Sequence, residues 1–161
     1  RNQAKTFIYA LLYGAGDAKL GSVAGGGAKT GANLRKSFFD NLPSFAHLKD
    51  KVSRAASKGH LKSLDGRKIY IRSEHAALNS LLQGAGAVTM KKALVILADK
   101  IKDAHFVANV HDEWQIEVIA EHAELVGKLG VEAIIEAGKV LKLNCPLDGE
   151  YKVGDNWSET H

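Results

Sequence analysis

The sequence contains little cysteine or proline, and it has no long uninterrupted apolar run. Its 161 residues include one cysteine and two prolines. A single cysteine excludes an intramolecular disulfide and a cysteine-based zinc ribbon. The best apolar run, 93–98, is far shorter than the ~18 residues that a membrane span needs, so we expect no membrane partner. The N-terminal residues show no signal-peptide pattern, and the cytoplasm is therefore the expected compartment.

The remaining composition is that of an ordinary globular chain. Hydrophobic residues make up 45% and charged residues 25% of the sequence, which suits one core of domain size. The formal net charge of +4 favours a polyanionic partner, although many proteins share such an excess. The first residue is Arg1, and a helical pattern begins there without a capping side chain. We therefore expect the sequence to be part of a longer chain.

Glycine, proline and Asp-Gly signals predict a mixed α and β chain that is mostly helical. We expect helices over 1–13, 17–24, 28–41, 44–57, 75–102 and 121–142. We expect hairpins from 61–64 with 67–71 and from 106–110 with 114–118, the second turning at 111–113, and a last strand near 150–153. Gly84 and Gly86 lie inside a predicted helix, where glycine costs about 1 kcal/mol, so we expect another segment to approach both closely. The apolar face predicted for the last long helix consists of Val126, Leu129, Ala133, Ala137 and Val140.

Two cations and two aromatic residues recur every four positions at the start of the chain. Successive members, Arg1, Lys5, Tyr9 and Tyr13, are rotated by only ~40° on a helix, so they form a stripe about 18 Å long. Basic side chains neutralise phosphate oxygens, and a phenol ring packs on a sugar or base. The stripe therefore suits a nucleoside triphosphate. The alternative is a solvated cationic edge beside two core tyrosines.

The motif Arg-x3-Lys-x3-Tyr-x3-Tyr-Gly resembles the fingers helix of family A DNA polymerases. The flanking residues 4–9 and 12–17 resemble the bacteriophage replicative branch most closely. This resemblance implies that Arg1 and Lys5 bind an incoming deoxynucleoside triphosphate and that Lys5 takes part in catalysis. It also implies that Tyr9 lies against the sugar and Tyr13 at the base-pair end.

Two adjacent carboxylates occupy the predicted turn at 111–113. Neighbouring residues of a strand point to opposite faces, so one carboxylate can lead and the other is secondary. Phosphoryl transfer uses carboxylates around two divalent ions ~3.5–4 Å apart. The His-Asp-Glu sequence resembles the second catalytic motif of the same family. That resemblance implies that Asp112 ligates two Mg²⁺ ions, that Glu113 supports this catalytic metal site, and that His111 approaches the primer end.

Polar residues at 75, 79 and 83 share one face of the predicted long helix. Such a stripe is usually only solvated, but His75, Asn79 and Gln83 match the family segment that touches the primer–template minor groove. Asparagine and glutamine offer a donor and an acceptor each, which suits the groove without demanding one sequence. His75 departs from the arginine of the cellular branch. Arg67 and Arg72 resemble the family's basic segment, for which we expect contacts to backbone phosphate.

The resemblance implies an α+β fold, with mostly helical fingers over 1–60 and a palm portion with part of an antiparallel sheet over 61–161. We expect the C-terminal part of a DNA-directed DNA polymerase from a phage-infected bacterium, an incomplete right-hand fold that binds primer–template DNA. Asn156–His161 resembles the family's own C-terminus, so we expect a natural end there. The segment with the other catalytic aspartate is not in the sequence, so the isolated chain should be inactive without an N-terminal polymerase portion. A non-catalytic DNA-binding remnant and one half of a split polymerase are the alternatives.

Overall fold

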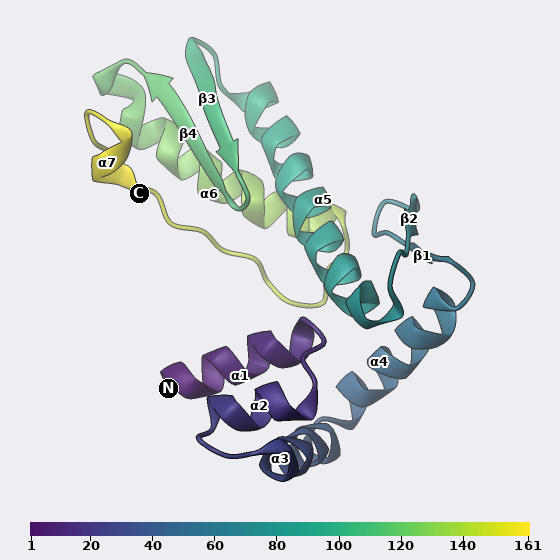
Figure 1. The fold of residues 1–161 in the computed structure, drawn as a ribbon. Helices are drawn as coiled ribbons and strands as arrows, with labels where there is room; N and C mark the ends of the chain where they lie inside the picture. Colours follow the sequence, from purple (N-terminus) through teal and green to yellow (C-terminus); the bar gives the residue numbers. More distant parts are fainter. The chain divides into compact units, whose positions relative to one another are not determined.

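The structure is a computed structural model that describes residues 1–161, and it divides into two compact units (Figure 1). The first unit is Arg1–Gly84 and the second is Ala85–His161. Both units combine helices with one antiparallel hairpin, in agreement with the expected α+β class. This division by contacts does not test the predicted fingers and palm portions, 1–60 and 61–161, which stay predictions.

Four helices open the first unit, and their ends follow local signals in the sequence. They are α1 (Asn2–Leu12), α2 (Asp17–Val23), α3 (Ala28–Asn41) and α4 (Pro43–Ala56). Gly14 and Gly25 follow α1 and α2 with φ of 80° and 74°, a conformation that glycine adopts without a steric penalty. Pro43 opens α4, where its missing N–H is not needed. Asp17 is the first residue of α2, and Gly16 holds the capping position.

Helices α2 and α3 pack with their backbones close together. A Cβ added at Gly31 would lie 2.7 Å from the Gly21 nitrogen and closer still to the Asp17 carbonyl oxygen. The Arg35 guanidinium of α3 donates from Nε to Asp17 Oδ1 and from Nη2 to the Ala15 carbonyl oxygen, both at 2.7 Å. Gly31 thus allows the two helices to approach closely, and Arg35 holds α2 and the loop after α1 against α3.

The first hairpin and the start of α5 complete the core of this unit. Strands β1 (His60–Lys62) and β2 (Lys68–Tyr70) pair antiparallel, with Leu61 opposite Ile69. Gly66 turns with φ of 85°, as the Asp-Gly signal predicts. The buried cluster joins α4, β1 and the first turn of α5, and its members are Val52, Ala56, Leu61, Ala77 and Leu78. Leu12 of α1 packs against this cluster, so the end of α1 has a fixed place in the unit.

Helix α5 (Ala77–Lys100) follows a short 3-10 turn, η1 (Glu74–Ala76), and crosses the division between the units. Contrary to the sequence expectation, Glu74–Lys100 is long and apolar enough to cross a membrane by length and composition, with a mean hydropathy of 1.4. The core helix of a soluble protein can have the same length and composition, so one such helix is weak evidence for a membrane span. Ile69 Cδ1 would lie 3.2 Å from a Cβ at Gly84, as predicted, but nothing approaches Gly86 within 4 Å.

The second unit contains a longer hairpin and a long helix. Strands β3 (Ala104–Val110) and β4 (Glu113–Val118) pair antiparallel, with a register shift between Phe106 and Ala108. Helix α6 (Ala120–Val140) contacts β4 and meets the end of α5, where Lys100 Nζ lies 2.6 Å from Glu136 Oε2. The predicted apolar face of α6 buries Val126, Ala133 and Ala137 and half-buries Leu129. Val140 was wrongly assigned to it, because it ends the helix and is 51% exposed.

Residues 141–156 pack along α6 without regular structure, so the strand predicted near 150–153 is wrong (Figure 1). No strand pairs with this segment; Tyr151 instead lies against Gly127 of α6 and donates to Glu124 Oε2 at 2.7 Å. Leu147 likewise lies against Gly138. The chain then forms a short helix, α7 (Trp157–Thr160), which the sequence analysis did not predict.

Candidate active site

The exposed face of α1 carries the predicted triphosphate stripe. Arg1, Lys5, Tyr9 and Tyr13 are all exposed, and the two tyrosines are 49% and 56% accessible. The tyrosine rings stack with centroids 6.5 Å apart, and Lys5 Nζ lies 5.8 Å from the centroid of Tyr9. This exposure argues against two core tyrosines, the alternative raised by the sequence. Neither Arg1 nor Lys5 forms an ion pair or a side-chain hydrogen bond, so both cations are free for an anion.

A shallow open depression lies over the basic end of this stripe. Its lining consists of Arg1, Asn2, Lys5, Ile8 and Tyr9. Asn2 and Ile8 were not predicted as site residues. Their position next to members of the stripe on the same helix is the signal that could have found them. The depression therefore combines two cations with an amide, an aliphatic side chain and a ring.

The far end of the stripe lies beside the start of the predicted DNA-contacting face. A Cβ at Gly14 would lie 2.7 Å from the His75 carbonyl oxygen, so the residue after Tyr13 touches η1. Asn79 and Gln83 follow on α5, with no side-chain hydrogen bond to another residue. The first unit thus brings the aromatic end of the stripe to the His75 end of the second predicted face, although the two are about 60 residues apart in the sequence.

The two predicted phosphate-contacting arginines differ in their surroundings. Arg67 Nε donates to Asp65 Oδ2 at 2.5 Å within the β1–β2 turn. Burial acts to raise the pKa of Asp65, but hydrogen bonds from Ser63 and Arg67 outweigh it and lower that pKa. Arg72 follows β2, is exposed, and has no such partner. Arg72 is therefore the freer of the two cations.

The β3–β4 turn presents one free carboxylate. Val110 and Glu113 face each other as the last strand pair, so the turn consists of His111 and Asp112 only. His111 has a φ of 52°, a left-handed conformation in which histidine is several-fold enriched among residues other than glycine. The Asp112 carboxylate is exposed and has neither an ion pair nor a hydrogen bond. Asp112 is therefore available to a ligand.

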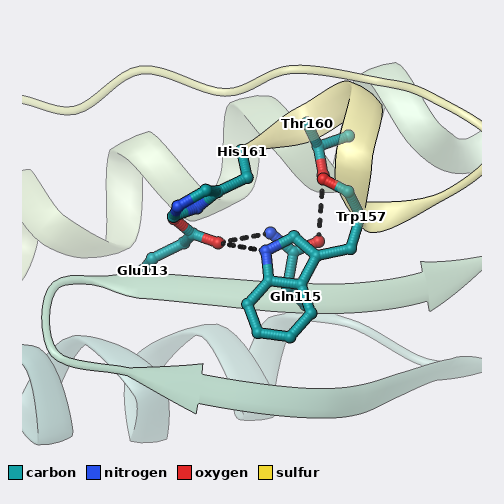
Figure 2. Close-up of polar contacts among 5 residues, drawn as sticks. All are labelled: Glu113, Gln115, Trp157, Thr160 and His161. Atoms are coloured by element: carbon teal, nitrogen blue, oxygen red, sulfur yellow. Dashed lines mark hydrogen bonds and ion pairs between the residues drawn. The ribbon is translucent and has the colours of Figure 1, made fainter.

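Glu113 differs from its neighbour because its carboxylate is already occupied (Figure 2). Its Oε1 accepts from Gln115 Nε2 at 2.6 Å and from Trp157 Nε1 at 2.9 Å, and its Oε2 lies 3.0 Å from His161 Nδ1. The hydrogen bond from Gln115, followed by that from His161, lowers the pKa of Glu113. The sequence pattern identified Glu113 but none of these partners. Strand alternation, which places 113 and 115 on one face, was the signal available for Gln115.

The donor set at the turn can be tested against Mg²⁺. No group of three or more His, Cys, Asp or Glu side chains gathers anywhere in the chain in a way that could hold a metal ion. Protein-bound Mg²⁺ usually keeps several waters and takes one or two carboxylates together with substrate phosphates. The free carboxylate of Asp112 fits such a ligand, whereas the occupied carboxylate of Glu113 fits it poorly.

Known proteins resemble this chain over nearly its full length. The model of DNA polymerase family A matches residues 1–159. The DNA-directed DNA polymerase of Escherichia phage Phieco32 is 43% identical over all of this chain and 28% of its own length, and that of Escherichia phage T7 is 37% identical over all of this chain and 27% of its own. DNA polymerase I of Bacillus subtilis is 29% identical over 98% of the chain and 19% of its own length. The chain therefore spans about a quarter of the phage relatives that it matches.

A solved structure has the same fold. The POL domain of Pol1 from M. smegmatis, in a complex with DNA primer-template and dNTP, superposes with a TM-score of 0.75 at 24% identity. The match covers 84% of this chain and 27% of that one. This likeness supports the partial α+β polymerase fold expected from the sequence. The match of the family model over residues 1–159 shows that the chain belongs to DNA polymerase family A.

Proposed function

We propose that this chain is the part of a DNA-directed DNA polymerase that binds the incoming nucleotide and supplies one metal-binding carboxylate. The observation that carries the proposal is the face of α1. Its two cations have no ion-pair or hydrogen-bond partner, and they lie in one line with two exposed tyrosines. A face of this kind offers the charge and the stacking surfaces that a nucleoside triphosphate requires.

The nucleotide would lie along this face with its phosphates at the basic end. Arg1 and Lys5 would offset the negative charge of the β and γ phosphates, which grows on the departing pyrophosphate during transfer. The ring of Tyr9 would pack against the sugar and that of Tyr13 against the base pair. Successive side chains of the stripe lie about 6 Å apart along the helix axis, in the same order as the phosphates, sugar and base of a nucleotide.

The metal part of the proposal rests on the β3–β4 turn. Asp112 would hold Mg²⁺, and Glu113, the other predicted metal and catalytic residue, would act from beside it. The bound ions would neutralise developing charge and favour the attacking primer hydroxyl. His111, the neighbour of Asp112 in this turn, would approach the end of the primer.

The DNA part rests on the polar face of η1 and α5 and on the basic first hairpin. His75, Asn79 and Gln83 would contact the minor groove of the primer–template with their hydrogen-bond donors and acceptors. Arg72, and Arg67 if released from Asp65, would neutralise backbone phosphates. The contact of Gly14 with His75 would then couple the base end of the nucleotide to the DNA.

The complete enzyme would add a deoxynucleotide to a primer 3′ end and release pyrophosphate. Its further catalytic aspartate would come from an N-terminal polymerase portion, and the cytoplasm of a phage-infected bacterium is the compartment that we propose. We expect no catalysis by the isolated chain, because one free carboxylate does not hold two metal ions.

Nucleotide binding by the isolated chain tests the proposal directly. We expect Lys5→Ala to weaken the binding of a fluorescent deoxynucleoside triphosphate about tenfold, the value of one charge-assisted hydrogen bond of ~1.5 kcal/mol. Lys29→Ala is the matched control, since Lys29 is exposed on α3 away from the stripe. Equal affinities of the two variants would refute the assignment of the α1 face.

Single-nucleotide primer extension with Mg²⁺ separates the fragment from its alternatives. No extension, together with primer–template binding that weakens with salt, is expected for a polymerase fragment. Extension that is lost in Asp112→Ala but kept in the exposed control Asp99→Ala would indicate a second chain that completes the enzyme. Extension that survives Asp112→Ala would refute the metal-site assignment.

A further inference from the structure

The end of the chain is attached to the β3–β4 hairpin by a small network of polar side chains. We name this network the C-terminal clasp; its members are Glu113, Gln115, Trp157, Thr160 and His161 (Figure 2). Glu113 receives one hydrogen bond within β4, from Gln115, and lies within hydrogen-bond distance of two groups from α7 and the residue after it. Thr160 Oγ1 adds a hydrogen bond to Gln115 Oε1 at 3.1 Å. Two strand residues therefore bind three residues that lie 44 to 48 positions further along the chain.

Polar contacts and one half-buried tryptophan hold α7 in place. The helix has four residues, none of them buried, and its only large apolar side chain, Trp157, is 47% exposed. Its first turn is organised internally, since Glu159 accepts from the Asp155 backbone and the Asn156 amide. Four residues form no stable helix in water on their own. The clasp is therefore the attachment of α7 to the sheet.

The attachment lies directly beside the residue that would bind metal. Glu113 opens β4 and follows Asp112, while His111 on the other side holds a left-handed φ of 52°. A two-residue turn has few remaining torsions, so fixing the first residue of β4 restricts the direction of the Asp112 side chain. Asp112 belongs to the turn, whereas Glu113 is the first residue of β4. Glu113 faces α7, and Asp112 is left without a partner.

A carboxylate offers about four acceptor sites, and Glu113 uses three of them for side chains. A metal ion held by both oxygens of Glu113 would compete with the donors from Trp157 and His161 that hold α7. Asp112 has no such competitor. We propose that Glu113 is a positioning residue that clasps the C-terminal helix to β4 and so orients Asp112, and that it is not itself a metal ligand; this inference rests on the proposed metal-binding role of Asp112.

Nuclear magnetic resonance of the two tryptophan indoles tests the clasp without any catalysis. The chain has two tryptophans, and Trp157→Phe assigns their signals by removing one while keeping a ring at that position. We expect Glu113→Gln to shift the Trp157 indole signal and to accelerate its hydrogen exchange, because one amide oxygen replaces two charged acceptors. Glu117→Gln is the matched control, since Glu117 lies on the same face of β4 without a side-chain partner. An unmoved Trp157 signal in Glu113→Gln would overturn the proposal.

The same contact can be tested from its other side, should Glu113→Gln fail to fold. Trp157→Phe removes the indole Nε1–H donor together with the five-membered ring, and we expect it to move the backbone amide signals of residues 111–113. Unchanged amide signals there would equally overturn the clasp.

Titration with Mn²⁺ alone then separates the clasp from the metal site. Paramagnetic broadening of the turn signals should be lost in Asp112→Asn and kept in Glu113→Gln. Broadening lost in Glu113→Gln with an unmoved indole would make Glu113 a ligand and refute our inference. Absence of broadening in the unmodified chain would count against the proposed function instead, because the indole signals report the clasp independently of any metal.

Discussion

Replacing Gly31 by alanine tests how closely α2 and α3 must pack. A Cβ at this position would lie 2.7 Å from the Gly21 nitrogen and 2.8 Å from the Asp17 carbonyl carbon. The carbonyl oxygen of Asp17 would lie closer still, and ordinary van der Waals contact begins at 3.4 Å, so the helices would have to separate by more than about 0.7 Å. Both neighbours are backbone atoms, and no side-chain rotation can relieve the overlap.

The size of the effect follows from two opposing contributions. Overpacking costs about 1–3 kcal/mol, and the separation would also stretch the 2.7 Å ion pair between Arg35 and Asp17. Alanine is favoured over glycine inside a helix by roughly 0.5–1 kcal/mol. We therefore expect Gly31→Ala to lower the free energy of unfolding by about 1–2 kcal/mol, which is about a five- to thirtyfold change in the folded-to-unfolded ratio.

Chemical denaturation followed by far-ultraviolet circular dichroism measures this change. Gly86→Ala is the matched control, because it also lies inside a helix but has nothing within 4 Å of its added Cβ. Only the propensity gain applies there, so we expect it to be neutral or slightly stabilising. Equal stabilities for the two variants would refute the close packing of α2 and α3.

Three further predictions concern the second unit. The hydrogen bond to Glu124 raises the pKa of Tyr151. The stabilisation from this bond is therefore present below the ordinary tyrosine pKa of ~10 and is lost as the pH rises through the higher folded pKa. Phenolate absorbance should show one of the four tyrosines titrating late, and a late step that persists in Glu124→Gln would contradict this cause. Gly127→Ala would place a Cβ 2.6 Å from the Tyr151 Cγ. We therefore expect the Tyr151 ring to leave α6 and the late titration step to disappear. An unchanged titration would refute the contact between Tyr151 and Gly127. His111→Gly relieves a φ of 52°, which costs roughly 1–2 kcal/mol in residues other than glycine, but glycine also adds conformational entropy to the unfolded chain. We therefore expect denaturation followed by tryptophan fluorescence to show a net stabilisation of about 0.5 kcal/mol. A destabilised variant would show that the His111 side chain makes a stabilising contact.

Much of the secondary structure could be predicted because its signals are local. Pro43 and the glycines after α1 and α2 end or begin helices through their own backbone torsions, and Asp65-Gly66 specifies its turn in the same way. These preferences act within a few residues and need no partner. The four-residue period of the stripe on α1 likewise follows from helix geometry alone.

The errors fall where a distant segment decides the outcome. Residues 150–153 have strand-like composition, yet Tyr151 packs on Gly127 and no strand is available for pairing. Gly84 and Gly86 look equivalent in the sequence, but only Gly84 has a neighbour, Ile69 from the first hairpin. Local pattern does not specify which of two similar positions a remote side chain will reach.

The sequence by itself determined the chemistry offered by this chain: the cations and tyrosines on one helical face and the carboxylates at one turn. Their periodicity and adjacency are properties of consecutive residues. Only the tertiary structure decided that Asp112 is free while Glu113 is occupied, because the partners of Glu113 lie 44 and 48 residues away. It also brought Gly14 against His75 through the packing of the first unit. Contacts of this range depend on how helices and strands pack together, and no local period encodes them.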